Sequence, residues 1–164
     1  MKQFIPQKIC LKCLGCCRFA NSRSKWSPCL LSREIKIFKK KHIPLFLRPK
    51  SKKLRLVSGN DQFFCPFFNV VKNSCGIYGV RPFDCQLYPF MLRKRKNKVY
   101  IAVDINCPYI EKTFRGKKFN RYLNNLIIFL SQPSIKNIIR RDSQIIGNFP
   151  EKTVINLACL PLNK

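Results

Sequence analysis

Four cysteines fall within eight residues near the start of the chain, in the pattern Cys-x2-Cys-x2-Cys-Cys. They are Cys10, Cys13, Cys16 and Cys17. Sulfur atoms spaced by two residues can turn back onto one metal centre, whereas an apolar core has no need of such spacing. We therefore expect residues 1–30 to be rich in loops and to be organised by their cysteines.

Six further cysteines follow, and four of them extend the set of predicted metal ligands. These four are Cys65, Cys75, Cys85 and Cys107. Cys29 is expected to be a spare thiol, and Cys159 a small buried apolar residue. The single histidine, His42, follows a run of lysines, so we expect it on the surface or at a helix end rather than at a metal.

Disulfides are the main alternative use for ten cysteines. Disulfide scaffolds are typical of secreted chains, and residues 1–8 are not followed by the apolar segment of a signal peptide. The longest apolar run, Leu126 to Leu130, is far shorter than a membrane span. Adjacent Cys16 and Cys17 could bridge each other only with strain. The sequence therefore predicts a cytoplasmic protein with reduced thiols and no membrane segment.

The chain is strongly basic, with 33 Lys and Arg against 7 Asp and Glu and a formal net charge of +26. Such an excess is typical of proteins that bind nucleic acid or an anionic surface. Abundant Lys, Ile, Asn and Phe also indicate codons rich in A and T, which would add lysine without any partner. The basic runs lie in three separate segments without a recognition helix, so we expect only weak, non-specific nucleic-acid binding. These segments are Lys39 to Lys41, Lys50 to Arg55 and Arg93 to Lys98.

The hydrophobic pattern predicts a small α+β protein with short strands and C-terminal amphipathic helices. At 164 residues, one domain is expected over residues 1–164. Within it, residues 10–107 form the predicted cysteine-cluster core and residues 111–147 the C-terminal helical part. The expected elements are a helix over 33–41 capped by Ser32, strands over 54–57, 62–68, 88–92 and 99–103, a helix over 118–130, and a helix over 135–146 capped by Ser134.

Two further motifs accompany the opening cysteines: Cys65-Pro-Phe, and the run Cys-Gly-Ile-Tyr-Gly-Val-Arg-Pro-Phe-Asp-Cys-Gln-Leu-Tyr-Pro that begins at Cys75. In this order the motifs resemble those of the YkgJ-like CxxCxxCC cysteine cluster proteins, described as zinc- or iron-chelating. The resemblance extends from about Cys10 to Cys107 and implies a chelating domain without a known reaction. Gln86 stands where that family usually has arginine, and Tyr88 where it usually has phenylalanine; neither is an expected ligand.

Thiolates suit both zinc and iron, so the residues leave both metals open. The Cys-x2-Cys-x2-Cys run is also typical of bacterial ferredoxins, in which a remote Cys-Pro supplies another ligand. Cys65-Pro66 and Cys107-Pro108 are candidates for that remote role. Eight cysteines suit either one iron–sulfur cluster, such as a 4Fe–4S centre, with spare thiols, or two sites of four thiolates each.

Two residues among the ligands are candidates for tuning the metal. Arg81 could direct its guanidinium toward the anionic site, or could pin a turn at the surface. Tyr78 could donate a hydrogen bond to a thiolate, or could belong to the core with its hydroxyl satisfied elsewhere.

Catalytic motifs are absent from the sequence, which has no P-loop, no dinucleotide-binding glycine motif, no serine nucleophile elbow and no zinc-protease motif. We therefore expect a metal-binding protein. With iron it would be a redox accessory that exchanges electrons with a protein partner, and with zinc the site would be structural. Two alternatives stay open: a zinc-stabilised nucleic-acid-binding protein, and a cluster-containing protein-modifying enzyme, since some flagellin lysine methylases carry a related cysteine arrangement.

Overall fold

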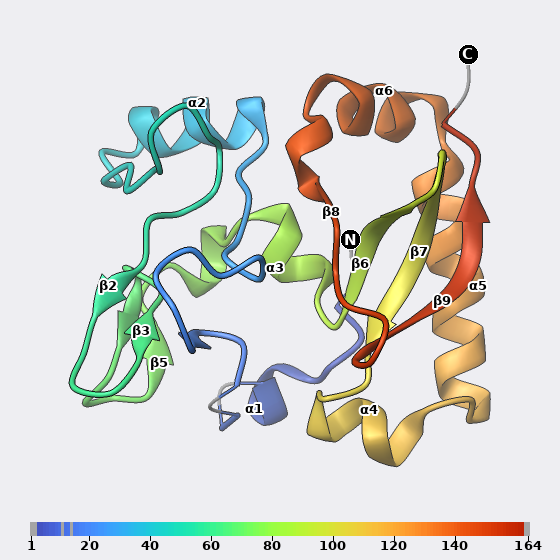
Figure 1. Cartoon of the computed structure of the whole chain (residues 1–164), viewed down its shortest axis with the longest axis horizontal. Coiled ribbons are helices and arrows are strands. Elements are labelled where there is room, and N and C mark those ends of the chain that lie inside the picture. The colour runs from blue at the N-terminus through green and yellow to red at the C-terminus, as the bar shows by residue number, and fades with distance from the viewer. Residues whose placement is uncertain (1–2, 11, 14, 163–164) are drawn as a thin grey trace. The chain divides into compact units, whose positions relative to one another are not determined.

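The computed structural model describes residues 3–10, 12–13 and 15–162. The chain divides into two compact units, Gln3–Gln86 and Leu87–Lys164, whose helices and strands are shown in Figure 1. Both units contain helices and strands, so the predicted α+β class is confirmed. The single domain expected over the whole chain stays a prediction, and its extreme ends, residues 1–2 and 163–164, lie outside the described residues.

The first unit is built from short elements. Its helices are α1 (Gln7–Cys10), α2 (Ser32–Lys40) and α3 (Phe83–Leu87), and its strands are β1 (Arg18–Phe19), β2 (Val57–Ser58), β3 (Phe63–Phe64), β4 (Phe68–Asn69) and β5 (Ser74–Cys75). Strands β1, β3 and β2 form one antiparallel sheet in that order, and β4 pairs with β5. Phe19, Leu30, Phe38, Leu54 and Cys65 are among the buried side chains that pack together as its core.

Helix α2 lies where a helix was expected, but its cap differs. Leu31 occupies the N-cap position, which corrects the prediction that Ser32 would cap the helix. Glu34 stabilises the first turn instead, because its Oε2 accepts a hydrogen bond of 2.8 Å from the backbone N–H of Leu31. The Ser32 hydroxyl accepts a hydrogen bond of 2.7 Å from Lys52. His42 follows the helix, exposed and with a φ of 53°, which agrees with its expected place at a helix end.

The strands of the first unit are shorter than expected. In the segment expected as a strand over 54–57, only Val57 belongs to a strand, the two-residue β2. Leu54 makes an isolated bridge with Leu47. The strand expected over 62–68 is divided into β3 and β4. The break has a local cause, since the N–H of Cys65 donates to the Cys17 carbonyl at 3.0 Å and Pro66 has no N–H to continue a ladder.

The second unit contains a four-stranded sheet and the three longer helical segments of the C-terminal part. Its strands are β6 (Phe90–Arg95), β7 (Lys98–Asp104), β8 (Ile146–Gly147) and β9 (Val154–Leu160), and its helices are α4 (Pro108–Thr113), α5 (Lys117–Ser131) and α6 (Pro133–Arg141). The sheet order is β8-β6-β7-β9, with β8 parallel to β6 and the other pairs antiparallel. Helix α5 packs against β9 and α6, and the rings of Phe90 and Phe119 lie 5.4 Å apart in the core.

The β6–β7 hairpin confirms the strand pair expected over 88–92 and 99–103. Its strands are longer than expected, so Arg93 to Arg95 belong to β6 and not to the hairpin tip. Arg93 is buried, although in the sequence it belongs to the basic segment Arg93 to Lys98.

The C-terminal segment differs most from expectation. The helix expected over 135–146 begins at Pro133 after the N-cap residue Gln132, which corrects the assignment of Ser134 as its cap, and it ends at Arg141. Ile146 instead pairs with Leu92 in the sheet, because a β-branched residue gains more from strand pairing and burial than from another helical turn. Strand β9 was not expected. It forms the edge of the sheet and leaves Cys159 exposed, so the prediction of a buried Cys159 is wrong.

Candidate metal centre

The first unit brings together seven of the eight predicted ligands. Their thiols influence one another in a connected group made of Cys10, Cys13, Cys16, Cys17, Cys65, Cys75 and Cys85. Cys107 belongs to the second unit, where it is buried at the N-cap of α4. Its role as a ligand stays a prediction. Cys29 is buried and Cys159 exposed.

Backbone hydrogen bonds fold the opening motif into tight turns. Helix α1 ends at Cys10, and the N–H of Cys13 donates to the carbonyls of Ile9 and Cys10 at 3.1 and 3.2 Å. The N–H of Arg18 then donates to the carbonyl of Gly15 at 3.1 Å. These turns keep cysteines that are close in sequence near one another, since Cys16 interacts with Cys10, Cys13 and Cys17. The bond from Cys65 to Cys17 described above adds a cysteine from the middle of the sequence.

Hydrogen bonds link four of the thiols in series, from Cys10 through Cys16 and Cys17 to Cys65. The bond with Cys16 and burial raise the pKa of the Cys10 thiol far above its ordinary value. The bond with Cys16 lowers the pKa of Cys17, but the bond with Cys65 and burial outweigh it and raise that pKa to about 12. Without a bound cation, the thiols of Cys10 and Cys17 therefore stay protonated near neutral pH.

The thiols of Cys16, Cys75 and Cys85 are also held in the neutral form. The bond with Cys10 lowers the pKa of Cys16, but the bond with Cys17 and desolvation reverse this effect, even though Cys16 as a whole residue is exposed. Burial raises the pKa of Cys75 and raises that of Cys85 well above its ordinary value. Several buried thiols that oppose one another's ionisation form a group that can ionise together only beside a positive charge.

The donor set fits zinc or an iron–sulfur cluster, because both are held by thiolate sulfur. In the described residues, however, no three Cys, His, Asp or Glu side chains stand where they could hold one metal ion. The thiols make hydrogen bonds with each other instead. Metal binding therefore requires these side chains to turn toward a common centre, and rotation about χ1 is the simplest way to move a cysteine sulfur.

Gln3 connects the two predicted tuning residues to the cysteines. Its Nε2 donates to the Cys10 sulfur at 3.6 Å, and its Oε1 accepts a hydrogen bond of 3.3 Å from the Tyr78 hydroxyl and another from Arg81. The Arg81 guanidinium lies 3.9 Å from the centre of the Tyr78 ring. Tyr78 thus donates to an amide and not to a thiolate. Sequence reasoning missed Gln3, since a glutamine seven residues before the first cysteine carries no pattern of its own.

Arg18 is a second cation beside the cysteines, next to Cys17 in the chain. Its guanidinium lies over the rings of Phe64 and Phe68, at 5.4 and 5.3 Å from their centres, and the two rings stack on each other. Its Nε is buried and has no hydrogen-bond partner. Two aromatic faces thus hold this cation, which is suited to stabilising a negatively charged centre.

Two carboxylates anchor the start of α3, the helix that carries Cys85. Asp84 accepts a hydrogen bond of 2.8 Å from the backbone N–H of Cys29, and desolvation of its carboxyl raises its pKa to about 6. Glu34 accepts one of 2.6 Å from the backbone N–H of Phe83. Cys29 therefore contributes its backbone to the positioning of α3.

Comparison with known proteins gives one match. The model of a family described as "CxxCxxCC: Putative zinc- or iron-chelating domain" matches residues 9–108, more than half of the chain. Neither the curated proteins nor the solved structures gave a match. Among the described residues, no helix has both the length and the apolar character that crossing a membrane requires.

Proposed function

Because the chain belongs to the CxxCxxCC family, we propose that its first unit binds zinc or an iron–sulfur cluster through cysteine thiolates. The family membership confirms the resemblance of the motifs and supports metal binding in general. The proposed ligands in this unit are Cys10, Cys13, Cys16, Cys17, Cys65, Cys75 and Cys85, and Cys107 stays the predicted remote ligand.

The observation that carries this proposal is the grouping of thiols from separate parts of the first unit, residues 10–17, residue 65 and residues 75–85, close enough to influence one another. Thiolate ligands of one metal centre need such a grouping, and they can ionise together only beside a cation. When bound, a zinc ion or an iron–sulfur cluster would supply the positive charge that lets neighbouring thiols ionise, and a cluster would also supply one-electron transfer.

The chain's own cations support the same proposal. Four thiolates carry more negative charge than one zinc ion neutralises, and the same holds for a four-iron cluster. Arg81 lowers the pKa of Cys10 and Cys75, against the stronger raising effects of thiol contacts and burial. Arg18 brings a second charge to the residue after Cys17. Both would stabilise the ionised form of the ligands.

The role depends on which metal is bound. With an iron–sulfur cluster, we propose an accessory in electron transfer that works with a protein redox partner. With zinc, the site would be structural and would hold together a unit whose strands are only two residues long. In both cases the thiols must stay reduced, so we propose the cytoplasm as the compartment.

The test is to purify the whole chain without oxygen and to measure zinc, iron and acid-labile sulfide per chain together with the absorption spectrum. Stoichiometric iron and sulfide with a brown colour that bleaches in air would support the electron-transfer role. A colourless protein with stoichiometric zinc would remove that role and leave the structural one. A folded monomer that contains no metal would overturn the proposal.

A further inference from the structure

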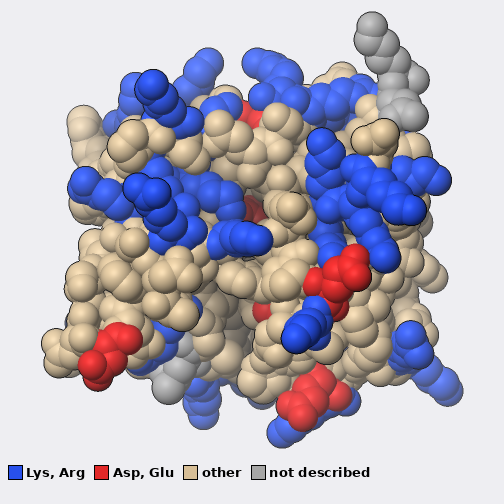
Figure 2. Space-filling view, in the orientation of Figure 1, with Lys and Arg blue, Asp and Glu red and all other residues tan. Residues whose placement is uncertain are grey.

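A basic hollow of about 550 Å³ lies on the second unit, between the end of strand β6 and the segment that joins β8 to β9. Four consecutive basic residues, Arg93 to Lys96, line one side, and residues 148–151 line the other. Figure 2 shows Lys and Arg side chains gathered over part of this unit beside a small acidic patch. Glu151 is the one acidic residue in the lining, so the hollow has a strong positive charge.

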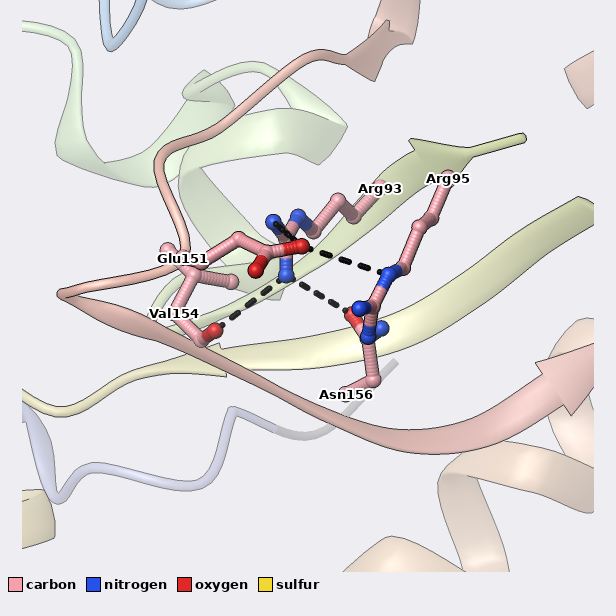
Figure 3. A network of polar contacts seen from close by, with 5 residues as sticks. All are labelled: Arg93, Arg95, Glu151, Val154 and Asn156. Atoms are coloured by element: carbon pink, nitrogen blue, oxygen red, sulfur yellow. Dashed lines mark hydrogen bonds and ion pairs between the residues drawn. The ribbon is translucent and has the colours of Figure 1, made fainter.

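The innermost basic residue is Arg93, whose side chain is only 5% exposed. Its Nη1 donates to the Val154 carbonyl at 3.3 Å and to Oδ1 of Asn156 at 3.2 Å (Figure 3). Its Nε is buried without a hydrogen-bond partner. A guanidinium has five N–H donors, and leaving a buried one unpaired is costly. The described residues therefore satisfy this cation only in part.

One carboxylate oxygen holds the two arginines of this strand face together. Oε1 of Glu151 lies 3.5 Å from Nη2 of Arg93 and 3.2 Å from Nε of Arg95, as Figure 3 shows. The Glu151 side chain is 65% exposed, and that of Arg95 is 52% exposed. The pair between Glu151 and Arg95 is exposed on both sides and contributes little stability, and the Glu151 carboxylate that also contacts Arg93 is open to solvent, so another anion can reach and replace it.

We propose that this hollow binds the phosphate group of a small molecule, which displaces the Glu151 carboxylate from Arg93 and Arg95. Residues two apart on a strand share one face, so both guanidinium groups reach the same place. Guanidinium groups match phosphate oxygens two at a time, and Lys94 and Lys96 add charge at the rim. A phosphate dianion carries two negative charges, so it neutralises more of this positive charge than the single Glu151 carboxylate does.

The hollow suits a phosphate group better than a nucleic-acid strand. Phe149 is the aromatic residue of its lining and is only 8% exposed. Its ring packs onto Gly147, where an added Cβ would lie 2.3 Å from the ring. Strand-binding sites offer exposed aromatic faces on which successive bases stack, and a ring buried in this way offers none. The expected ligand is therefore a small molecule that carries a phosphate group.

The experiment is calorimetric titration of the whole chain, purified without oxygen, with inorganic phosphate at constant ionic strength and with chloride as the reference anion. A parallel titration with glycerol 3-phosphate distinguishes free phosphate from a phosphate monoester as the source of the group. Both Arg95→Gln and Glu151→Gln change exposed side chains, so both variants should keep the fold, which circular dichroism checks.

Arg95→Gln should weaken phosphate binding about tenfold, because it removes a charged hydrogen-bond donor. Glu151→Gln should strengthen binding by a similar factor, since it removes the competing charge and keeps the shape of the side chain. Arg121→Gln, an exposed arginine on α5 of the same unit, is the matched control and should change nothing.

Three results would overturn the proposal. The first is an absence of saturable binding of either phosphate compound. The second is an equal loss of phosphate affinity in the Arg95 and Arg121 variants, which would mean that binding depends on the overall charge of the protein. The third is weaker binding after Glu151→Gln. Tight binding of single-stranded DNA by a protein that ignores inorganic phosphate would replace the small ligand with a nucleic-acid surface.

Discussion

The backbone N–H of Phe83 donates a hydrogen bond of 2.6 Å to Oε1 of Glu34, a residue of α2 that is distant in sequence. The other oxygen of the same carboxylate accepts a hydrogen bond from Leu31. One buried side chain thus holds the first turn of α2 and the first residue of α3. Because α3 carries Cys85, Glu34 helps to position a proposed metal ligand without being one.

Glu34→Gln should lower the free energy of unfolding by about 1–3 kcal/mol at pH 4, because a carboxyl group offers two acceptor oxygens and an amide only one, which leaves the other buried donor unpaired. The single tryptophan, Trp26, lies in the first unit, so its fluorescence during denaturant unfolding measures the effect. Glu111→Gln, at an exposed position on α4, is the control. Equal stability of the Glu34 variant and the natural chain would contradict the assigned role.

The same carboxyl predicts a pH dependence. Burial raises the pKa of Glu34 above its ordinary value. The folded state therefore binds this proton more tightly than the unfolded state does, so its contribution is complete at low pH and is lost as pH rises through the folded-state pKa. The stability difference between the natural chain and Glu34→Gln should shrink as pH increases from 4 to 7. A difference that grows over this range would show that the pKa is lowered instead.

Single Cys→Ser changes should separate ligands from other cysteines. Loss of one thiolate opens the metal site to chelators, so Cys10, Cys13, Cys16, Cys75 and Cys85 should each lose metal when changed. Cys159→Ser is the best control, because that residue is exposed and far along the sequence from the group; Cys29→Ser should also retain metal. Metal analysis after gel filtration with a chelator makes the measurement. If Cys29 proved essential and Cys107 did not, the remote ligand would be misassigned.

Gln3→Ala should leave metal content unchanged but speed metal loss to a chelator about 10- to 100-fold, the usual effect of removing a partner of a ligand. The variant removes the hydrogen bond to the Cys10 sulfur and frees Tyr78 and Arg81. Gln62→Ala in the same unit is a matched control. Identical release rates for the natural chain and the Gln3 variant would mean that this side chain does not support the site.

Nucleic-acid binding should be weak and non-specific. Titration of duplex and single-stranded DNA at physiological salt should show little binding, and binding at low salt should fall steeply as salt is added. The comparison is a variant with Lys94, Lys96 and Lys98 changed to Glu. Tight, selective binding by the natural chain that this variant abolishes would make nucleic acid the leading partner.

The sequence predicted the elements whose signals are local and strong. The β6–β7 hairpin and helix α5 were expected within a few residues of their observed ends. Alternating apolar and polar residues indicate strands, and apolar residues at helical spacing indicate a helix, so both signals can be read locally. Strand β9 was missed, since its formation depends on pairing with β7. Ile145 and Ile146 continue the helical spacing of α6. Ile146 belongs to the sheet because it pairs with β6, a contact that the local sequence does not reveal.

The residues of the candidate site also fall into those that the sequence predicts and those that it does not. Cysteine spacing and the ordered motifs were sufficient to predict a metal-binding group of thiols, because metal ligands need particular residue types at particular distances. Gln3 and Glu34 act through contacts between segments distant in sequence, and no local pattern reveals them. The buried state of Arg93 was hidden for the same reason, since in the sequence it belongs to an ordinary basic run.

The exposed thiol of Cys159 has a practical consequence for handling the protein. It lies on the edge strand of the sheet, where another copy of the chain can approach. In air, two such thiols from different molecules can oxidise to a covalent cross-link. Preparations kept without reductant should therefore accumulate dimers that disappear on adding dithiothreitol, and Cys159→Ser should give a sample that remains homogeneous during storage.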